Sequence, residues 1–128
     1  MKHKGAVYVI TGGQRGLGLA MAEFLSLAGA TCVLLDLNQS ALQQARKSLT
    51  FPQRIITYSC DITNEQQVEE TFQSIRKACG KIDALINNAG IMADEQLISV
   101  KDGVVTAKMT LQSWQKVIDV NLTGTFLC

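Results

Sequence analysis

The sequence predicts an α/β protein built on a mostly parallel sheet, with helices covering both faces. Three observations support this prediction. Strand and helix patterns alternate along all 128 residues, which is typical of parallel strands joined by helical crossovers. Within the strand-like segment 31–36, residues 32–35 are apolar in succession, as a strand buried on both faces must be. A cluster of glycines at residues 12–18 joins the first strand to the first helix.

Four segments have the apolar, β-prone composition of strands, and they lie at residues 6–10, 31–36, 54–60 and 82–90. Helical spacing of apolar residues follows at about residues 14–28, 38–49, 63–79 and 110–128. Candidate N-caps of the last three helices are Asn38 or Ser40, Thr63 or Asn64, and Thr110. Gly29 and Gly80 are placed to end the first and third helices. We expect the doubly wound strand order 3-2-1-4.

Residues 97–106 depart from this alternation. Two short β-prone arms flank Lys101-Asp102-Gly103, a combination that favours a tight hairpin turn. We therefore expect a small hairpin inserted before the last helix. That helix carries its apolar residues on one face, and the sequence shows no signal that ends it before Cys128. The apolar residues are Leu111, Trp114, Val117, Ile118, Leu122 and Phe126.

Composition and charge exclude several classes of protein. Hydrophobic residues make up 47% and charged residues 18% of the chain, which suits an ordered α/β protein rather than a disordered one. The net charge of +1 offers no basic footprint for nucleic acid or an anionic membrane. No apolar run reaches the roughly 18 residues of a membrane span, and the N-terminus lacks the apolar core of a signal peptide. We expect a cytoplasmic location.

The sequence offers no metal site. Its cysteines are scattered without a C-x-x-C pair, and we expect them to pack as small hydrophobic residues. The single histidine, His3, lies near the chain end and is poorly placed as a ligand or base. A metal would need carboxylates alone, and the sequence contains no cluster of them.

The glycine cluster reads Thr11-Gly12-x-x-x-Gly16-x-Gly18. A strand, a tight turn and a helix N-terminus in this order can bind phosphate, because the first helical N–H groups lack partners and carry the positive end of the helix dipole. Glycine suits a turn with positive φ and a backbone that must approach the phosphate closely. The spacing differs from the usual G-x-G-x-x-G fingerprint.

Asp36 lies at the C-terminal end of the second strand, 18 residues beyond Gly18. An acid at about this distance can accept hydrogen bonds from the adenosine ribose of NAD, and its charge would repel the 2′-phosphate of NADP. Arg15 could meet that phosphate or lie in solvent. Because the carboxylate occupies the ribose position itself, we expect NAD in preference to NADP.

Three further polar groups follow the later strands. Asp61 could accept from an adenine amino group, cap the following helix, or do both. Asn87 and Asn88 end the fourth strand and need hydrogen-bond partners. We expect them to brace the loop after the first strand, while Ala89 and Gly90 leave room for ribose and nicotinamide.

Asn121 falls on the apolar face of the last helix, where a buried amide without partners would cost about 1–3 kcal/mol. It either brackets a neighbouring helix or marks a kink or ordered-water site that serves an active site.

Together these motifs resemble the short-chain dehydrogenase/reductase family along the whole chain, and more loosely its bacterial 3-oxoacyl-acyl-carrier-protein reductases. The glycine cluster resembles the coenzyme turn, Asp36 the NAD-selecting acid, and Asp61 the adenine-contacting acid. Asn121 resembles the first member of the catalytic tetrad. The implied cofactor-binding residues are Thr11, Gly12, Gln14, Arg15, Gly16, Leu17, Gly18, Asp36, Leu37, Cys60, Asp61, Ile62, Asn88, Ala89 and Gly90.

The resemblance implies a Rossmann-type NAD(P)-binding domain over residues 1–128, truncated before the family's catalytic Ser and Tyr-x-x-x-Lys. We expect the N-terminal part of an oxidoreductase that interconverts a small-molecule alcohol and ketone by hydride transfer. The fragment itself should be inactive, and the full-length protein a homo-oligomer. The hairpin around Asp102 lengthens the usual family connection, so no family contacts are carried over to it.

Two alternatives remain open. A stand-alone, non-catalytic dinucleotide-binding module would leave the apolar fourth strand without an outer neighbour. An S-adenosylmethionine methyltransferase also uses a glycine-rich turn and an acid after the second strand, but it does not account for Asn87-Asn88-Ala89-Gly90 or for Asn121.

Overall fold

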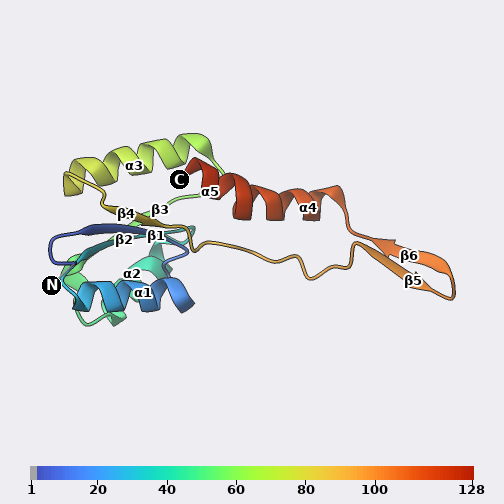
Figure 1. The fold of residues 1–128 in the computed structure, drawn as a ribbon, viewed down its shortest axis with the longest axis horizontal. Coiled ribbons are helices and arrows are strands. Elements are labelled where there is room, and N and C mark those ends of the chain that lie inside the picture. The colour runs from blue at the N-terminus through green and yellow to red at the C-terminus, as the bar shows by residue number, and fades with distance from the viewer. Residues whose placement is uncertain (1–2) are drawn as a thin grey trace.

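The computed structural model describes residues 3–128 and has the expected α/β architecture (Figure 1). Four parallel strands form one sheet in the order β3-β2-β1-β4, which confirms the predicted topology. They are β1 (Val7–Thr11), β2 (Thr31–Asp36), β3 (Ile55–Ser59) and β4 (Ala84–Ile86). β5 (Ile98–Lys101) and β6 (Val104–Lys108) form a separate antiparallel pair, which confirms the predicted hairpin.

The helices cover the sheet from both sides. α1 (Gly16–Leu27) and α2 (Gln39–Ser48) lie on one face, and α3 (Glu65–Cys79) lies on the other (Figure 1). α4 (Leu111–Ile118) and α5 (Gly124–Leu127) are on the side of α3, and α4 extends beyond the sheet toward the hairpin (Figure 1). No helix within residues 3–128 is long and apolar enough to cross a membrane.

The core lies on both sides of β1 and β2, because alternate residues of a strand point to opposite faces. Ile10 and Leu34 pack with the helices α1 and α2, and Val9 and Val33 pack on the other face with Ile75 of α3. These residues are fully buried. The centre of β2 is therefore apolar on both faces, as the sequence predicts.

Local capping residues set the helix boundaries. The side chain of Asn38 accepts a hydrogen bond from the Ala41 N–H at 3.0 Å, so Asn38 rather than Ser40 caps α2. Asn64 caps α3 and Thr110 caps α4 in the same way. Gly80 ends α3 with a φ of +77°, a conformation that favours glycine.

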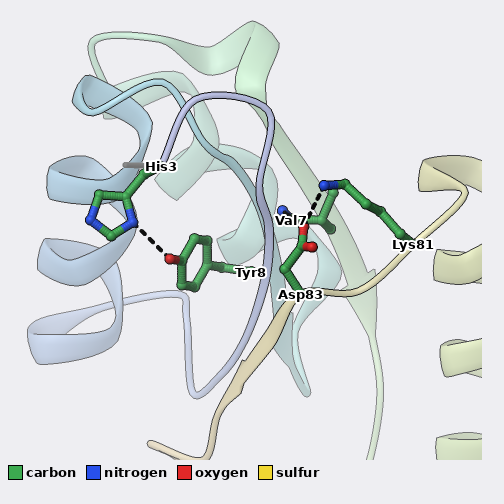
Figure 2. Close-up of polar contacts among 5 residues, drawn as sticks. All are labelled: His3, Val7, Tyr8, Lys81 and Asp83. Atoms are coloured by element: carbon green, nitrogen blue, oxygen red, sulfur yellow. Dashed lines mark hydrogen bonds and ion pairs between the residues drawn. The ribbon is translucent and has the colours of Figure 1, made fainter. Parts of the chain in front are cut away.

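Polar contacts hold the amino ends of β1 and β4 together (Figure 2). The Val7 N–H donates to the Asp83 carboxylate at 2.8 Å, and the Asp83 N–H donates to the Val7 carbonyl at 2.9 Å. Lys81 pairs with the same carboxylate at 2.8 Å. The Lys81 contact, and then the Val7 N–H, hold the pKa of Asp83 below its ordinary value. Figure 2 also shows the 2.7 Å hydrogen bond between His3 Nδ1 and the Tyr8 hydroxyl.

The structure corrects two sequence expectations. The fourth strand is only three residues long. Leu17 and Phe24, which belong to the helical apolar spacing of residues 14–28, are not buried but 69% and 67% exposed. They lie beside an apolar hollow that Ile86 of β4 also lines. Because β4 is the last strand of the described sheet, nothing in residues 3–128 covers this side of α1.

Candidate functional site

A cavity of about 460 Å³ opens at the carboxyl ends of the parallel strands. Such an edge collects the loops that follow each strand. The cavity brings together most of the residues that the sequence singled out, namely Gly12, Gln14, Arg15, Gly16, Asp36, Leu37, Cys60, Asp61, Ile62, Asn88, Ala89 and Gly90. Thr11 and Gly18 are buried and lie outside its lining, and Leu17 lines the apolar hollow beside α1 instead.

The glycine turn is packed tightly on one side and open on the other. A Cβ at Gly18 would lie 2.3 Å from the Gly12 carbonyl oxygen, and a Cβ at Gly12 would lie 2.9 Å from Asn88 Nδ2. Both positions therefore exclude a side chain. At Gly16, which has a φ of +57°, a Cβ would meet no atom within 4 Å. The backbone at Gly16 thus faces open space at the start of α1.

The start of α1 differs from the starts of the other long helices. Its N-cap is Arg15, whose side chain makes no capping hydrogen bond, and its first turn holds no acidic residue. The N-terminal amides of α2, α3 and α4 each receive a side-chain cap. Uncapped amides carry the positive end of the helix dipole. The cavity edge beside Gly16 is therefore suited to a negatively charged group.

Asp36 lies against the glycine turn. Its Oδ2 accepts a hydrogen bond from the Gln14 N–H at 3.3 Å, and its Oδ1 accepts one from the Leu37 N–H at 2.9 Å. These two backbone donors orient the carboxylate at the cavity wall, where the end of β2 meets the turn. The sequence predicts this juxtaposition, and the structure contains it.

Asn88 braces the glycine turn, as predicted. Its Nδ2 donates to the carbonyls of Thr11 at 3.0 Å and Gly12 at 3.1 Å. The Thr11 hydroxyl in turn accepts from the N–H groups of Asn88 and Ala89, both at 3.0 Å. The expectation for Asn87 is wrong, because this side chain is exposed and lies outside the brace. Neighbouring residues at a strand end point in opposite directions, so only one of the pair can face the turn.

Asp61 lies at the far side of the cavity from the glycine turn. Its Oδ1 accepts from the Thr63 N–H at 2.9 Å and from the Thr63 hydroxyl at 2.7 Å. It closes the turn before α3, whose cap is Asn64. The neighbouring Cys60 is buried, and burial, with a smaller contribution from the Asp61 charge, raises the pKa of its thiol against an opposing hydrogen bond from Thr71. Cys60 is therefore a neutral thiol at neutral pH.

Asn121 lies in the π-helical turn Asp119–Thr123, between α4 and α5, and joins it to the loop after β4. Its Oδ1 accepts from the Ile91 N–H, and its Nδ2 donates to the Ile91 carbonyl, both at 2.8 Å. The prediction of a buried amide is wrong, because Asn121 is exposed. In residues 3–128 no element covers this face, and the amide is satisfied by backbone instead. The predicted kink is present as the π-helical turn.

Three cavity residues are absent from the sequence-based set: Leu35, Ile91 and Val120. Leu35 is the residue before Asp36, and its carbonyl accepts from the Gly13 N–H at 3.2 Å. Ile91 and Val120 are far apart in the sequence, and the Asn121 hydrogen bonds bring their segments together. Their positions next to Gly90 and Asn121 are the only signal in the sequence that could have indicated them.

Comparisons with known proteins agree with this architecture. Residues 6–128 match the family model described as short chain dehydrogenase. Human 3-hydroxyacyl-CoA dehydrogenase type-2 is 40% identical over 96% of this chain and 45% of its own length. The 3-oxoacyl-(acyl-carrier-protein) reductase of Thermotoga maritima is 32% identical over 98% of this chain and 48% of its own. The crystal structure of NAD+-bound xylitol dehydrogenase superimposes with a TM-score of 0.83 at 34% identity, covering 99% of this chain and 46% of that one. The chain thus spans about half the length of the curated relatives it matches.

Proposed function

Because the chain belongs to the short-chain dehydrogenase family, we propose that it binds NAD and forms the cofactor-binding part of an enzyme that interconverts an alcohol and a ketone. The placement of Asp36 beside the glycine turn is the observation that most supports this proposal. It puts a carboxylate, held by two backbone N–H groups, next to a helix start that lacks a cap. A dinucleotide needs both features, one for the ribose hydroxyls and one for the diphosphate.

The residues present fit such a cofactor along the whole cavity. The diphosphate would rest over the open backbone at Gly16. Asp36 would accept from the adenosine ribose, while Asp61 and Ile62 would line the adenine end. The small residues Ala89 and Gly90 would leave room for the nicotinamide half. When bound, the nicotinamide supplies or takes up the hydride.

The contribution of Asn121 to the reaction would be to position neighbouring groups. Its two hydrogen bonds hold Ile91 at the cavity wall. An amide has four hydrogen-bonding positions, and Ile91 takes two of them, so Asn121 could still hold a water in a proton relay. The serine, tyrosine and lysine of the family's tetrad would belong to the part of the relatives that this chain does not cover.

NAD is the preferred cofactor in this proposal. A 2′-phosphate on the ribose would stand beside the oriented carboxylate of Asp36 and be repelled by it. Arg15 also lines the cavity, but this residue is exposed, so solvent and salt screen its attraction for a phosphate. The charge held in place at the ribose position should therefore dominate.

Replacement of Asp36 by alanine tests the proposal. Asp36→Ala should weaken NAD binding by about 1.5–3 kcal/mol, the scale of a hydrogen bond to a charged group, and improve NADP binding relative to NAD. Calorimetric titration of the purified protein with both cofactors measures this. Asp94→Ala removes the same charge from an exposed segment outside the cavity and should change neither affinity. An unchanged cofactor preference in Asp36→Ala would overturn the assignment.

We further propose that the enzyme is cytoplasmic and forms a homo-oligomer. Its substrate in this proposal is a small molecule. The large apolar side chains of Leu111 and Trp114 on α4 are 77% and 52% exposed, which supports a contact surface on this helix. Analytical ultracentrifugation of the protein and of Trp114→Glu would show whether α4 takes part in assembly.

A further inference from the structure

The hairpin formed by β5 and β6 has no role in the proposed function. It projects from the body beyond α4 (Figure 1). Within residues 3–128, β5 pairs with β6 alone, so one edge of β5 is open. An isolated two-stranded hairpin is at best marginally stable in water, and further strands stabilise it. The open edge of β5 is therefore a place where another strand can add.

Hydrogen bonds within the hairpin show which main-chain groups of β5 face outward. The Leu97 carbonyl accepts from the N–H of the residue after β6 at 3.0 Å, and the Ser99 carbonyl accepts from the Thr106 hydroxyl at 3.2 Å. Both carbonyls point toward β6. Because successive residues of a strand direct their N–H and C=O groups to opposite sides, those of Ile98 and Val100 point to the open edge. This edge thus offers two donors and two acceptors.

The side chains along this edge do not protect it from pairing. Ile98 and Val100 are 56% and 61% exposed, and residues 97–100 contain neither a proline nor a charge. Edge strands are commonly blunted by proline, by charged side chains or by a bulge. The bulge of this hairpin lies on β6, because two consecutive residues of β5 span the three residues Val105–Ala107. β5 itself is free of these devices.

The charges that flank β5 suit a second copy of the same strand in antiparallel orientation. Glu95 precedes the strand, and Lys101 is its last residue. If two β5 strands lie antiparallel about a two-fold axis at Ser99, Lys101 of each copy comes beside the segment that holds Glu95 of the other. A parallel arrangement would place like charges together, which destabilises a strand pair.

The same register satisfies the main chain of both copies. It places Ile98 opposite Val100 of the second copy, so the outward N–H and C=O groups of these residues pair with one another. It also aligns Asp102, in the turn, with the neutral Gln96 of the second copy. A two-fold contact uses the same patch on both molecules and closes on itself, so the pairing ends at two copies.

We infer that β5 is an interaction surface for a second copy of this chain. The two β5 strands pair antiparallel about an axis at Ser99 and form a four-stranded sheet in the order β6-β5-β5-β6. Ion pairs between Lys101 and Glu95 flank the axis on both sides. This contact is separate from the surface of α4 and needs no cofactor, so it does not rest on the proposed function.

Sedimentation equilibrium of the purified full chain tests the contact with a proline substitution. Val100→Pro removes an N–H that faces the open edge, and proline is tolerated at such a position. It should weaken self-association about tenfold, because each dimer loses two hydrogen bonds. Lys108→Pro is the matched control on the outer edge of β6, where the N–H also faces away from the hairpin, and it should associate like wild type. Repeating both in Trp114→Glu separates this contact from α4.

Reversal of the flanking charges gives a second test that leaves the strand intact. Lys101→Glu and Glu95→Lys should each weaken self-association about tenfold at low salt, because an exposed ion pair becomes a repulsion at two places in each dimer. The double variant exchanges the two charges and should restore the wild-type association. Failure of the double variant to recover, after both single variants lose association, would contradict the antiparallel register.

Cross-linking locates the axis. Residues opposite each other in a non-hydrogen-bonded pair have Cα atoms about 4.5 Å apart, which is within the range of a disulfide. Ser99→Cys should therefore form a covalent dimer when glutathione disulfide is added as the oxidant. Val104→Cys places a thiol at an exposed residue of β6, away from the axis, and should remain monomeric on a non-reducing gel.

The possible failures can be told apart. Wild-type protein that stays monomeric at the highest concentration reached, or equal cross-linking of Ser99→Cys and Val104→Cys, would overturn the inference. If Trp114→Glu abolishes association while Val100→Pro leaves it unchanged, the copies meet through α4 and the assignment to β5 is wrong. None of these results changes the NAD binding expected of wild type and Asp36→Ala, so the proposed function is tested separately.

Discussion

At the residue scale, Asn88 connects the two loops on which the cavity depends. Its single amide group contacts the carbonyls of Thr11 and Gly12, and its main-chain N–H contacts the Thr11 hydroxyl. The turn cannot move away from β4 without breaking these bonds. A Cβ at Gly12 would also collide with this amide, so the glycine and the asparagine form one packed unit.

Substitution of Asn88 by alanine should therefore destabilise the fold. Asn88→Ala loses two hydrogen bonds and leaves two carbonyls without these donors, which should lower the free energy of unfolding by about 2 kcal/mol. Urea denaturation followed by circular dichroism measures this change. Asn87→Ala is the matched control, because its exposed side chain should contribute less than about 0.5 kcal/mol. Equal effects of the two substitutions would contradict the brace.

At the element scale, the short strand β4 depends on contacts at its amino end. The strand is three residues long and pairs only with β1. Asp83, the residue before it, bonds to the main chain of Val7 in both directions and pairs with Lys81 (Figure 2). These contacts lie at the opposite end of the strand from the brace made by Asn88. β4 is thus held at both ends, which positions Ala89 and Gly90 beside the turn.

The lowered pKa of Asp83 makes this contact dependent on pH. Because the folded-state pKa lies below the ordinary value of 3.8, the ionised carboxylate stabilises the fold above that pH. The contribution is lost as the pH falls from 3.8 through the lower folded-state pKa. Asp83→Asn should therefore be less stable than wild type at neutral pH, and the difference should shrink in strong acid. Urea denaturation at several pH values measures it.

The companion variant Lys81→Gln removes the ion pair but keeps the Val7 hydrogen bond, so it should show part of the same pH dependence. Added salt should reduce the contribution of the ion pair, because Asp83 and Lys81 are both exposed enough for screening. A difference between Asp83→Asn and wild type that stays constant down to strongly acidic pH would rule out this explanation.

At the scale of the whole molecule, the chain divides into a packed body and a projecting hairpin. The hairpin formed by β5 and β6 extends away from the sheet beyond α4 (Figure 1). Every residue of β6 is exposed. The two ends of the hairpin are close together, because the Met109 N–H donates to the Leu97 carbonyl at 3.0 Å. The stability of the body should therefore depend little on the hairpin.

Replacement of residues 98–108 by two glycines tests this division. The shortened protein should unfold with a free energy within about 0.5 kcal/mol of wild type, since surface residues contribute little. Leu34→Ala changes the fully buried centre of β2 and should lower the free energy of unfolding by about 2–5 kcal/mol. It serves as the positive control, because it shows that the assay detects a loss of stability. A large loss of stability on removing the hairpin would mean that it packs on the body in solution.

Local features of the sequence predict the elements and much of the cavity. Capping by Asn38 and Asn64 depends on contacts within a single helical turn. The hairpin follows from Asp102 and Gly103, whose positive φ angles of 51° and 76° suit the turn that this pair favours. The cavity residues that were predicted lie directly after strands, and parallel strands bring such positions to one edge.

The tertiary structure alone decided which surfaces are covered and which distant segments meet. The amphipathic pattern places Leu17 and Phe24 on one face of α1, but only the position of α1 beside the last strand leaves them exposed. Asn121 looks like a buried amide in the sequence, whereas the fold pairs it with the backbone of Ile91. Side-chain periodicity specifies a face of an element, and the neighbouring elements determine whether that face is buried.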